Sequence, residues 1–114
     1  MIYHMLLLSA WQRQPVDQPY KGDTLASEGF IHCTGEIDRL ALVANRFYRH
    51  QPGEFVILGI NPAQVQAEIK WELADRHSFP HIYGSLNLDA VVDVIKFPRD
   101  VDGQFLQPIE LQRT

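Results

Sequence analysis

Long apolar runs and one alternating segment predict most of the strands of this chain. Ile2 to Leu8 is a continuous apolar run of strand length, which is typical of a central strand buried on both faces. Phe55 to Ile60 is another continuous apolar strand, and Val91 to Phe97 is predicted as a last long strand. A fourth segment, Glu68 to Leu73, alternates, which predicts Ile69, Trp71 and Leu73 on its inward face. A short strand is also expected over Phe30 to Cys33.

Helical spacing is clearest after Thr34, a good N-cap residue that Glu36 and Asp38 follow in the first turn. An apolar face then repeats at helical intervals through Ile37, Leu40, Ala41, Ala44, Phe47 and Tyr48. Ser9 and Asn61 are each expected to cap a short helix, and a helical turn is expected over Leu25 to Glu28. An irregular segment is expected over Ala74 to Leu86.

The order of these elements predicts an α+β fold. One substantial helix and about five or six strands do not alternate strictly, which favours small mixed or antiparallel sheets over a doubly wound parallel sheet. No linker, repeat or low-complexity stretch interrupts the 114 residues. We therefore expect a single domain over residues 1–114.

Composition narrows the class of protein further. With 46% hydrophobic and 21% charged residues, the chain is too apolar to be disordered. No apolar run approaches the roughly 20 residues that a membrane span needs, so no membrane partner is expected. The single cysteine, Cys33, suits a reducing compartment and predicts a cytoplasmic protein. A net charge of −4 argues against DNA as a partner, although a local basic groove stays possible.

The phrase Glu28-Gly29-Phe30-Ile31-His32-Cys33-Thr34 is the first candidate site. Phe30 and His32 share one face of the expected strand, and Thr34 begins the expected helix, where backbone N–H groups can bind an anion. A buried His32 beside an ordinary N-cap explains the phrase equally well. His32-Cys33-Thr34 also matches one half of the paired H-x-T elements of two-histidine phosphoesterases, but neither His4 nor His81 begins a second such element.

The phrase Phe79-Pro80-His81-Ile82-Tyr83-Gly84-Ser85-Leu86-Asn87 is the second candidate site. Its rings lie in a segment expected to be a loop, where they suit a wall against a planar ligand or a small satellite core.

Two isolated polar residues outside these phrases are further candidates. Glu72 points away from the inward face of its strand, so it is either a solvated carboxylate or a catalytic one. His4 is either a core histidine with a partner or part of a pocket wall.

Several familiar arrangements are missing from the sequence. His32 and Cys33 are adjacent and point to opposite faces, so no metal is expected. The chain has no glycine-rich dinucleotide fingerprint, no phosphate-binding P-loop and no G-x-S-x-G elbow.

Together these phrases resemble the family of small domains of unknown function numbered 952. The resemblance covers almost the whole chain, and the E-G-F-I-H-C and F-P-H-I-Y-G-x-L-N phrases are specific. The segments that carry it are Ile2 to His4, Leu25 to Thr34, Val43 to Tyr48, Trp71-Glu72 and Phe79 to Asn87. It implies a fold similar to ADP-ribosyltransferases and RNA 2′-phosphotransferases, in which two small sheets surround an NAD-binding cleft.

The resemblance also implies roles for individual residues. His4 matches a first-strand histidine that binds the ribose on the nicotinamide side, and Tyr83 or Phe79 would stack on a ring of NAD. Glu72 would stabilise an oxocarbenium-like transition state, and His32 and Arg46 would contact phosphate. The serine-threonine-serine element, the glutamate-x-glutamate pair and the Arg-His-His-Arg set of those transferases are not matched.

The sequence therefore predicts an enzyme that binds NAD or another nucleotide-like ligand, for ADP-ribosyl transfer or for glycosidic or phosphate chemistry. The expected catalytic residues are Glu72, His4 and His32. The expected ligand-binding residues are Phe30, Thr34, Arg46, Phe79, His81, Tyr83 and Asn87. The alternatives are a module that binds a small molecule without turnover and a domain that docks on a partner protein. The sequence leaves the oligomeric state open.

Overall fold

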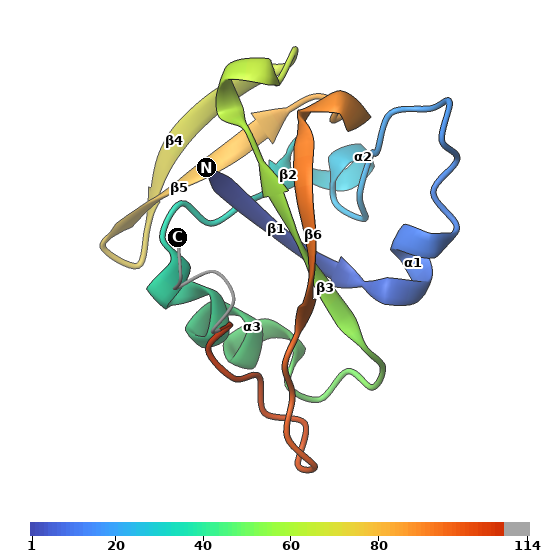
Figure 1. Cartoon of the computed structure of the whole chain (residues 1–114). Coiled ribbons are helices and arrows are strands. Elements are labelled where there is room, and N and C mark those ends of the chain that lie inside the picture. Colours follow the sequence, from blue (N-terminus) through green and yellow to red (C-terminus); the bar gives the residue numbers. More distant parts are fainter. Residues whose placement is uncertain (109–114) are drawn as a thin grey trace.

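The computed structural model describes residues 1–108 and places six strands there in two antiparallel sheets (Figure 1). The first sheet has the order β1-β3-β6 and the second β2-β5-β4. The strands are β1 (Ile2–Leu7), β2 (Ile31–His32), β3 (Phe55–Ile60), β4 (Glu68–Ala74), β5 (His77–Tyr83) and β6 (Val91–Phe97). The helices are α1 (Leu8–Gln12), α2 (Leu25–Glu28), α3 (Leu40–Tyr48) and the short 3-10 helices η1 (Ile37–Arg39), η2 (Pro62–Gln64) and η3 (Leu88–Ala90). The predicted α+β class, with two small sheets and one main helix, is confirmed.

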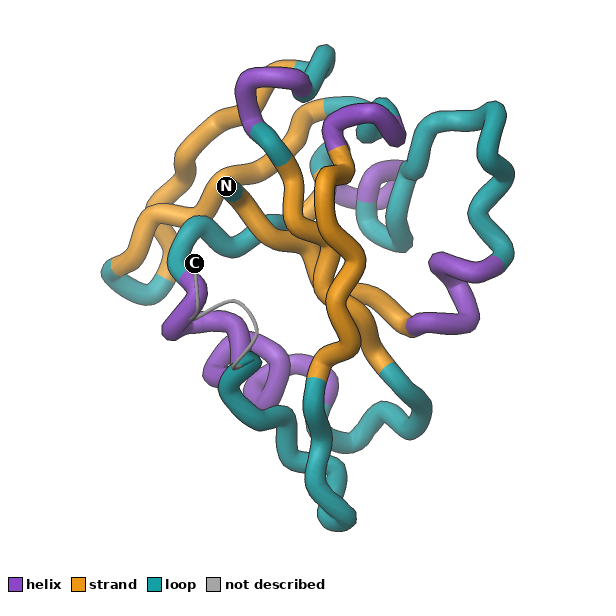
Figure 2. The backbone as a smooth tube through the Cα atoms, viewed as in Figure 1, coloured by secondary structure: helices purple, strands orange, loops and turns teal. Residues whose placement is uncertain are grey.

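The central strand of the first sheet is β3, not β1 as predicted, and β3 is buried at every position. The neighbouring β1 is nearly as buried, whereas the edge strand β6 leaves Val92 and Val94 about half exposed. One face of this sheet packs against the second sheet, where Leu6 and Leu58 meet Ile82 in one core cluster. The other face packs against α3, where Ile57 meets Leu40. Figure 2 shows α3 on one side of this sheet and the short helices α1 and α2 on the other. No helix within residues 1–108 has both the length and the apolar character needed to cross a membrane.

The segment after β4 is not irregular, so that prediction is wrong. Asp75 and Arg76 both adopt positive φ, 49° and 69°, and form a two-residue hairpin turn between β4 and β5. Neither residue is the glycine or asparagine that usually marks such a turn. Pro80 also argues against a central strand, because proline lacks an N–H to donate. Here its carbonyl still accepts a bond from the Cys33 N–H, at 3.1 Å.

The main helix begins later than predicted. Thr34 does not cap it, because its backbone N–H and C=O bond to Tyr3 at 2.7 and 2.8 Å and join β1 to the end of β2. Phe47, which was expected on the buried face, is 66% exposed, and Val43 packs in the core instead.

Other local predictions had mixed outcomes. The helical turn α1 begins at Leu8 and has no side-chain cap, so Ser9 is not its cap. On β4 only Ile69 packs on the core, whereas Trp71 and Leu73 are 58% and 76% exposed, so their inward assignment is wrong. The capping role of Asn61 is confirmed, because its Oδ1 accepts the Ala63 N–H at 3.0 Å.

Candidate functional site

The face of the second sheet that points away from the core carries most of the predicted site residues. Register explains why: His32 lies directly opposite His81, and Glu72 lies directly opposite Phe79. Because strand side chains alternate, these residues share the face opposite Ile31 and Ile82. We call this surface the polar face, and its members are His32, Glu68, Lys70, Glu72, Phe79, His81 and Tyr83.

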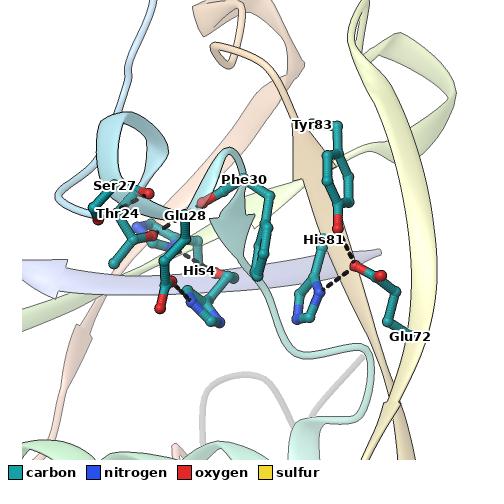
Figure 3. A network of polar contacts seen from close by, with 9 residues as sticks. His4, Thr24, Ser27, Glu28, Phe30, Glu72, His81 and Tyr83 are labelled. Atoms are coloured by element: carbon teal, nitrogen blue, oxygen red, sulfur yellow. Dashed lines mark hydrogen bonds and ion pairs between the residues drawn. The ribbon is translucent and has the colours of Figure 1, made fainter.

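Glu72 joins two neighbouring side chains of β5 on this face. Its Oε1 accepts a hydrogen bond from His81 Nδ1 at 2.8 Å and another from the Tyr83 hydroxyl at 2.6 Å (Figure 3). These two bonds, that of Tyr83 first, lower the pKa of Glu72, while the same contact raises the pKa of Tyr83. The carboxylate is therefore ionised at neutral pH and can only accept, so His81 carries its proton on Nδ1. The other ring nitrogen of His81, Nε2, has no hydrogen-bond partner in the described chain.

A second carboxylate holds His32. The helical turn α2 ends at Gly29, whose φ of 86° reverses the chain into β2. This reversal brings Glu28 against His32 four residues later, with 2.5 Å between Glu28 Oε2 and His32 Nε2. Both side chains are about half exposed. The remaining ring nitrogen, His32 Nδ1, has no hydrogen-bond partner among residues 1–108.

Phe30 connects these two pairs. Its ring stacks on His81, with 4.2 Å between centroids and 20° between planes, and it also contacts His32 at 4.7 Å and Tyr83 at 5.1 Å. The rings of His32 and His81 lie 5.2 Å apart, edge to face. Figure 3 shows Phe30 beside His81, between the two carboxylate–histidine pairs. Two carboxylate-bound imidazoles therefore lie next to each other on one surface.

His4 supports this arrangement from behind the strand. Its Nδ1 donates to the His32 carbonyl at 2.6 Å, and its Nε2 accepts from the Tyr20 hydroxyl at 2.8 Å. Burial lowers the pKa of His4 to about 4, and the bond to the carbonyl only partly offsets this. His4 is therefore neutral, and both of its nitrogens have partners inside the protein.

A cavity of about 410 Å³ adjoins the polar face at His32. It lies where β1 meets the connection between α1 and α2 and the end of α3, and His4, Tyr20, Thr24 and Tyr48 contribute to its wall. Thr24 also donates from its hydroxyl to the Phe30 carbonyl at 3.0 Å, which ties the cavity wall to the polar face. His32 is the residue that the cavity and the polar face share.

Three of the predicted ligand-binding residues lie elsewhere. Thr34 is only 4% exposed, so the anion corner expected around it is closed to a ligand. Arg46 forms an ion pair with Asp75 in the β4–β5 turn. Asn87 binds the backbone at the end of η2. Its side chain donates to the Gln64 carbonyl at 2.8 Å and accepts from the Gln66 N–H at 2.9 Å. Phe79 is on the polar face opposite Glu72.

Sequence reasoning missed three contributors to the site. Glu28 lies in the first candidate phrase and was identifiable from its spacing, because a one-turn helix ended by Gly29 places it beside His32. Lys70 lies on the same face of β4 as Glu72, and its Nζ lies 4.6 Å from the centroid of the Tyr83 ring. Tyr20 lies in an expected loop, and no local signal pairs it with His4.

No three His, Cys, Asp or Glu side chains in the described part of the chain converge in the way a metal ion needs. Instead, Glu72 bonds to His81 and Tyr83, and Glu28 bonds to His32. The arrangement is suited to proton transfer, because each imidazole has one nitrogen fixed by a carboxylate and one nitrogen free.

The fold and this arrangement define an α+β protein of two small antiparallel sheets with paired histidines on one sheet face. A family model matches residues 5–94, and the chain therefore belongs to the family described as protein of unknown function (DUF952). This match confirms the family resemblance of the two candidate phrases. No curated protein matches the chain.

Solved structures show the same fold. The crystal structure of protein CC0527 from Caulobacter crescentus is 24% identical, covers 97% of each chain and has a TM-score of 0.83. A crystal structure of a double methionine variant of that protein gives the same values. Its solution NMR structure is 23% identical, covers 99% of this chain and 95% of that chain, and has a TM-score of 0.72.

Proposed function

We propose that this protein is an enzyme that catalyses proton transfer at a phosphate or glycosidic bond of a nucleotide-like ligand. One observation carries the proposal. His32 and His81 are direct cross-strand neighbours, and each has one nitrogen held by a carboxylate and the other without a hydrogen bond to residues 1–108. Paired imidazoles of this kind supply a general base and a general acid to one reacting bond.

The roles of the two histidines follow from their partners. His81 accepts a proton at Nε2 from an attacking water or hydroxyl, and ionised Glu72 stabilises the imidazolium that forms. Protonated His32 donates from Nδ1 to the leaving oxygen, while Glu28 balances the positive charge of its ring. Phe30 fixes the relative orientation of the rings by stacking.

ADP-ribosyl transfer from NAD is a second candidate, and one observation favours it. Only Oε1 of Glu72 takes part in hydrogen bonds within the described chain, so Oε2 of this ionised carboxylate is available to an oxocarbenium-like centre. The likeness to ADP-ribosyltransferases that the candidate phrases imply belongs to this proposal. Acid–base chemistry remains the better supported reaction, because two histidines and two carboxylates take part in it.

Turnover of a defined panel tests the proposal. Purified protein is incubated with NAD, 2′,3′-cyclic nucleotides and RNA ends that carry a phosphate, and products are separated by chromatography. We expect turnover of at least one substrate, and its loss in His81→Gln and His32→Gln. His77→Gln is the matched control, because His77 lies on the same face of β5 but makes no bond to Glu72.

Glu72→Gln separates chemistry from binding. The amide keeps the shape of the side chain but lacks its charge, so turnover is expected to fall while binding of the same substrate persists. Binding without any product from the wild-type protein, measured as thermal stabilisation, would contradict the enzyme and support a binding module. Equal turnover in His81→Gln and His77→Gln would remove His81 from the mechanism.

A further inference from the structure

The cavity next to His32 differs in charge from the rest of the chain. The protein has a net charge of −4, yet Arg13 and Lys21 line this cavity and outnumber its one acidic residue, Asp23. We infer that the cavity binds a nucleoside monophosphate, with its phosphate held by Arg13, Lys21 and His32. This inference rests on the proposed function, because it names the substrate class for the same histidines.

Both cations are free to meet a phosphate. Within residues 1–108 neither Arg13 nor Lys21 forms an ion pair, whereas Arg46, Arg39 and Lys96 each have an acidic partner. An arginine binds phosphate through two parallel N–H donors, and a lysine adds a compact charge. His32 also lines the cavity, and its ring supplies a third donor to the phosphate when it is protonated.

The remaining wall suits a nucleoside. Tyr48 presents a half-buried ring that packs on Phe55 with 5.2 Å between centroids, so a flat base can lie against a ring that is held in place. Burial and the nearby carboxylates of Asp23 and Glu28 raise the pKa of Tyr48, so its hydroxyl keeps its proton and can donate. The amides of Gln18 and Gln51, which also line the cavity, can read the edge of a base.

The size of the cavity favours one nucleotide over two. Its volume of about 410 Å³ lies near the small end of the ~300–1,000 Å³ range of small-molecule sites. A mononucleotide fills such a space, whereas NAD, with two nucleotides, would extend beyond it. The shared residue His32 then places the phosphate beside His81, whose ring lies 5.2 Å from that of His32.

Titration of the isotope-labelled full chain by NMR and calorimetry tests the inference. The probes are AMP, GMP, CMP and UMP, with adenosine, ribose 5-phosphate and NAD as comparisons. We expect at least one monophosphate to bind at least tenfold more tightly than adenosine, ribose 5-phosphate or NAD, and to shift the amide signals of Thr24, His32 and Tyr48. Equal affinity for adenosine, or a tenfold preference for NAD, would overturn the inference.

The double variant Arg13→Gln/Lys21→Gln is expected to bind the monophosphate at least tenfold more weakly. Arg76→Gln, in the β4–β5 turn outside the cavity wall, is the matched charge control and is expected to keep wild-type affinity. All three positions are exposed, so the variants should fold, and their NMR spectra check this. Unchanged affinity in the double variant would overturn the inference.

The experiments distinguish a failure of the inferred ligand site from a failure of the proposed enzyme. If a monophosphate binds as described but the wild-type protein turns over neither that monophosphate nor any substrate in the panel, the proposed enzyme is wrong and the inferred ligand site stands. If turnover is found and Arg13→Gln/Lys21→Gln leaves the KM of the substrate unchanged, the enzyme stands and this ligand site is wrong.

Discussion

His4 makes the stability of this protein depend on pH. Its pKa is about 4 in the folded state, against an ordinary value of 6.5. Between these values the unfolded chain binds a proton at His4 and the folded chain does not, so a fall in pH favours unfolding. The contribution of His4 is therefore complete above pH 6.5 and is lost progressively as the pH falls toward 4.

The size of this effect follows from the two pKa values. The difference between 6.5 and about 4, at about 1.4 kcal/mol for each pH unit, corresponds to about 3 kcal/mol below pH 4. About 2 kcal/mol of this is already lost at pH 5. A domain of this size has a free energy of unfolding of about 5–15 kcal/mol, so the loss is easily measured.

Urea unfolding followed by tryptophan fluorescence measures it between pH 8 and pH 5. We expect the free energy of unfolding of the wild-type protein to fall by about 2 kcal/mol more than that of His4→Gln over this interval. His50→Gln, at an exposed position two residues past the end of α3, is the control for removal of a histidine. Glu72, whose pKa lies below its ordinary 4.5, contributes only below this interval.

Two results would refute the reasoning about His4. One is an equal pH slope for the wild-type protein and His4→Gln, which would show that the folded protein protonates His4 as readily as the unfolded chain. The other is an NMR titration of the His4 ring with a midpoint near its ordinary value. Either result would mean that the bonds to the His32 carbonyl and Tyr20 do not hold a neutral ring.

Three further predictions address the site and the core. Glu72→Gln should return the pKa of Tyr83 toward its ordinary value, because the carboxylate that opposes loss of its proton is gone; ultraviolet titration measures this, and an unchanged pKa would contradict the bond. Ile82→Ala should cost about 2–5 kcal/mol in urea unfolding, and Leu73→Ala, which is 76% exposed, far less; equal costs would contradict the burial of Ile82 in the core and the exposure of Leu73 at the end of β4. Gly29→Ala should cost about 1–2 kcal/mol through its positive φ alone, because open space surrounds a Cβ there; no loss would contradict the left-handed turn.

Local sequence patterns determined much of the fold. The two continuous apolar runs became β1 and β3, because a strand buried on both faces needs apolar side chains at every position. The segment Val91 to Phe97 became the partly exposed edge strand β6. The alternation of side chains along β4 correctly placed Glu72 and Ile69 on opposite faces of that strand. Gly29 ended α2 as predicted, because a left-handed residue at a helix end favours glycine.

Tertiary pairing decided the parts that local patterns could not reach. The strand β5 contains Pro80 and follows a turn without glycine, so its own sequence argues for a loop, and only its position between β2 and β4 makes it a strand. The exposure of Trp71 depends on how far β4 extends past the core, which no spacing records.

For the site, the sequence by itself determined which residue types are present and which face of a strand each one takes. It pointed to His32, His81, Glu72 and Tyr83, but not to which of these side chains bond to one another. The antiparallel register of β2 with β5 set the two histidines side by side, and the packing of β1 left His4 neutral behind them. The physical reason is that side-chain alternation is a local property of the backbone, whereas contacts between strands 28 or more residues apart depend on how whole sheets bury their apolar faces.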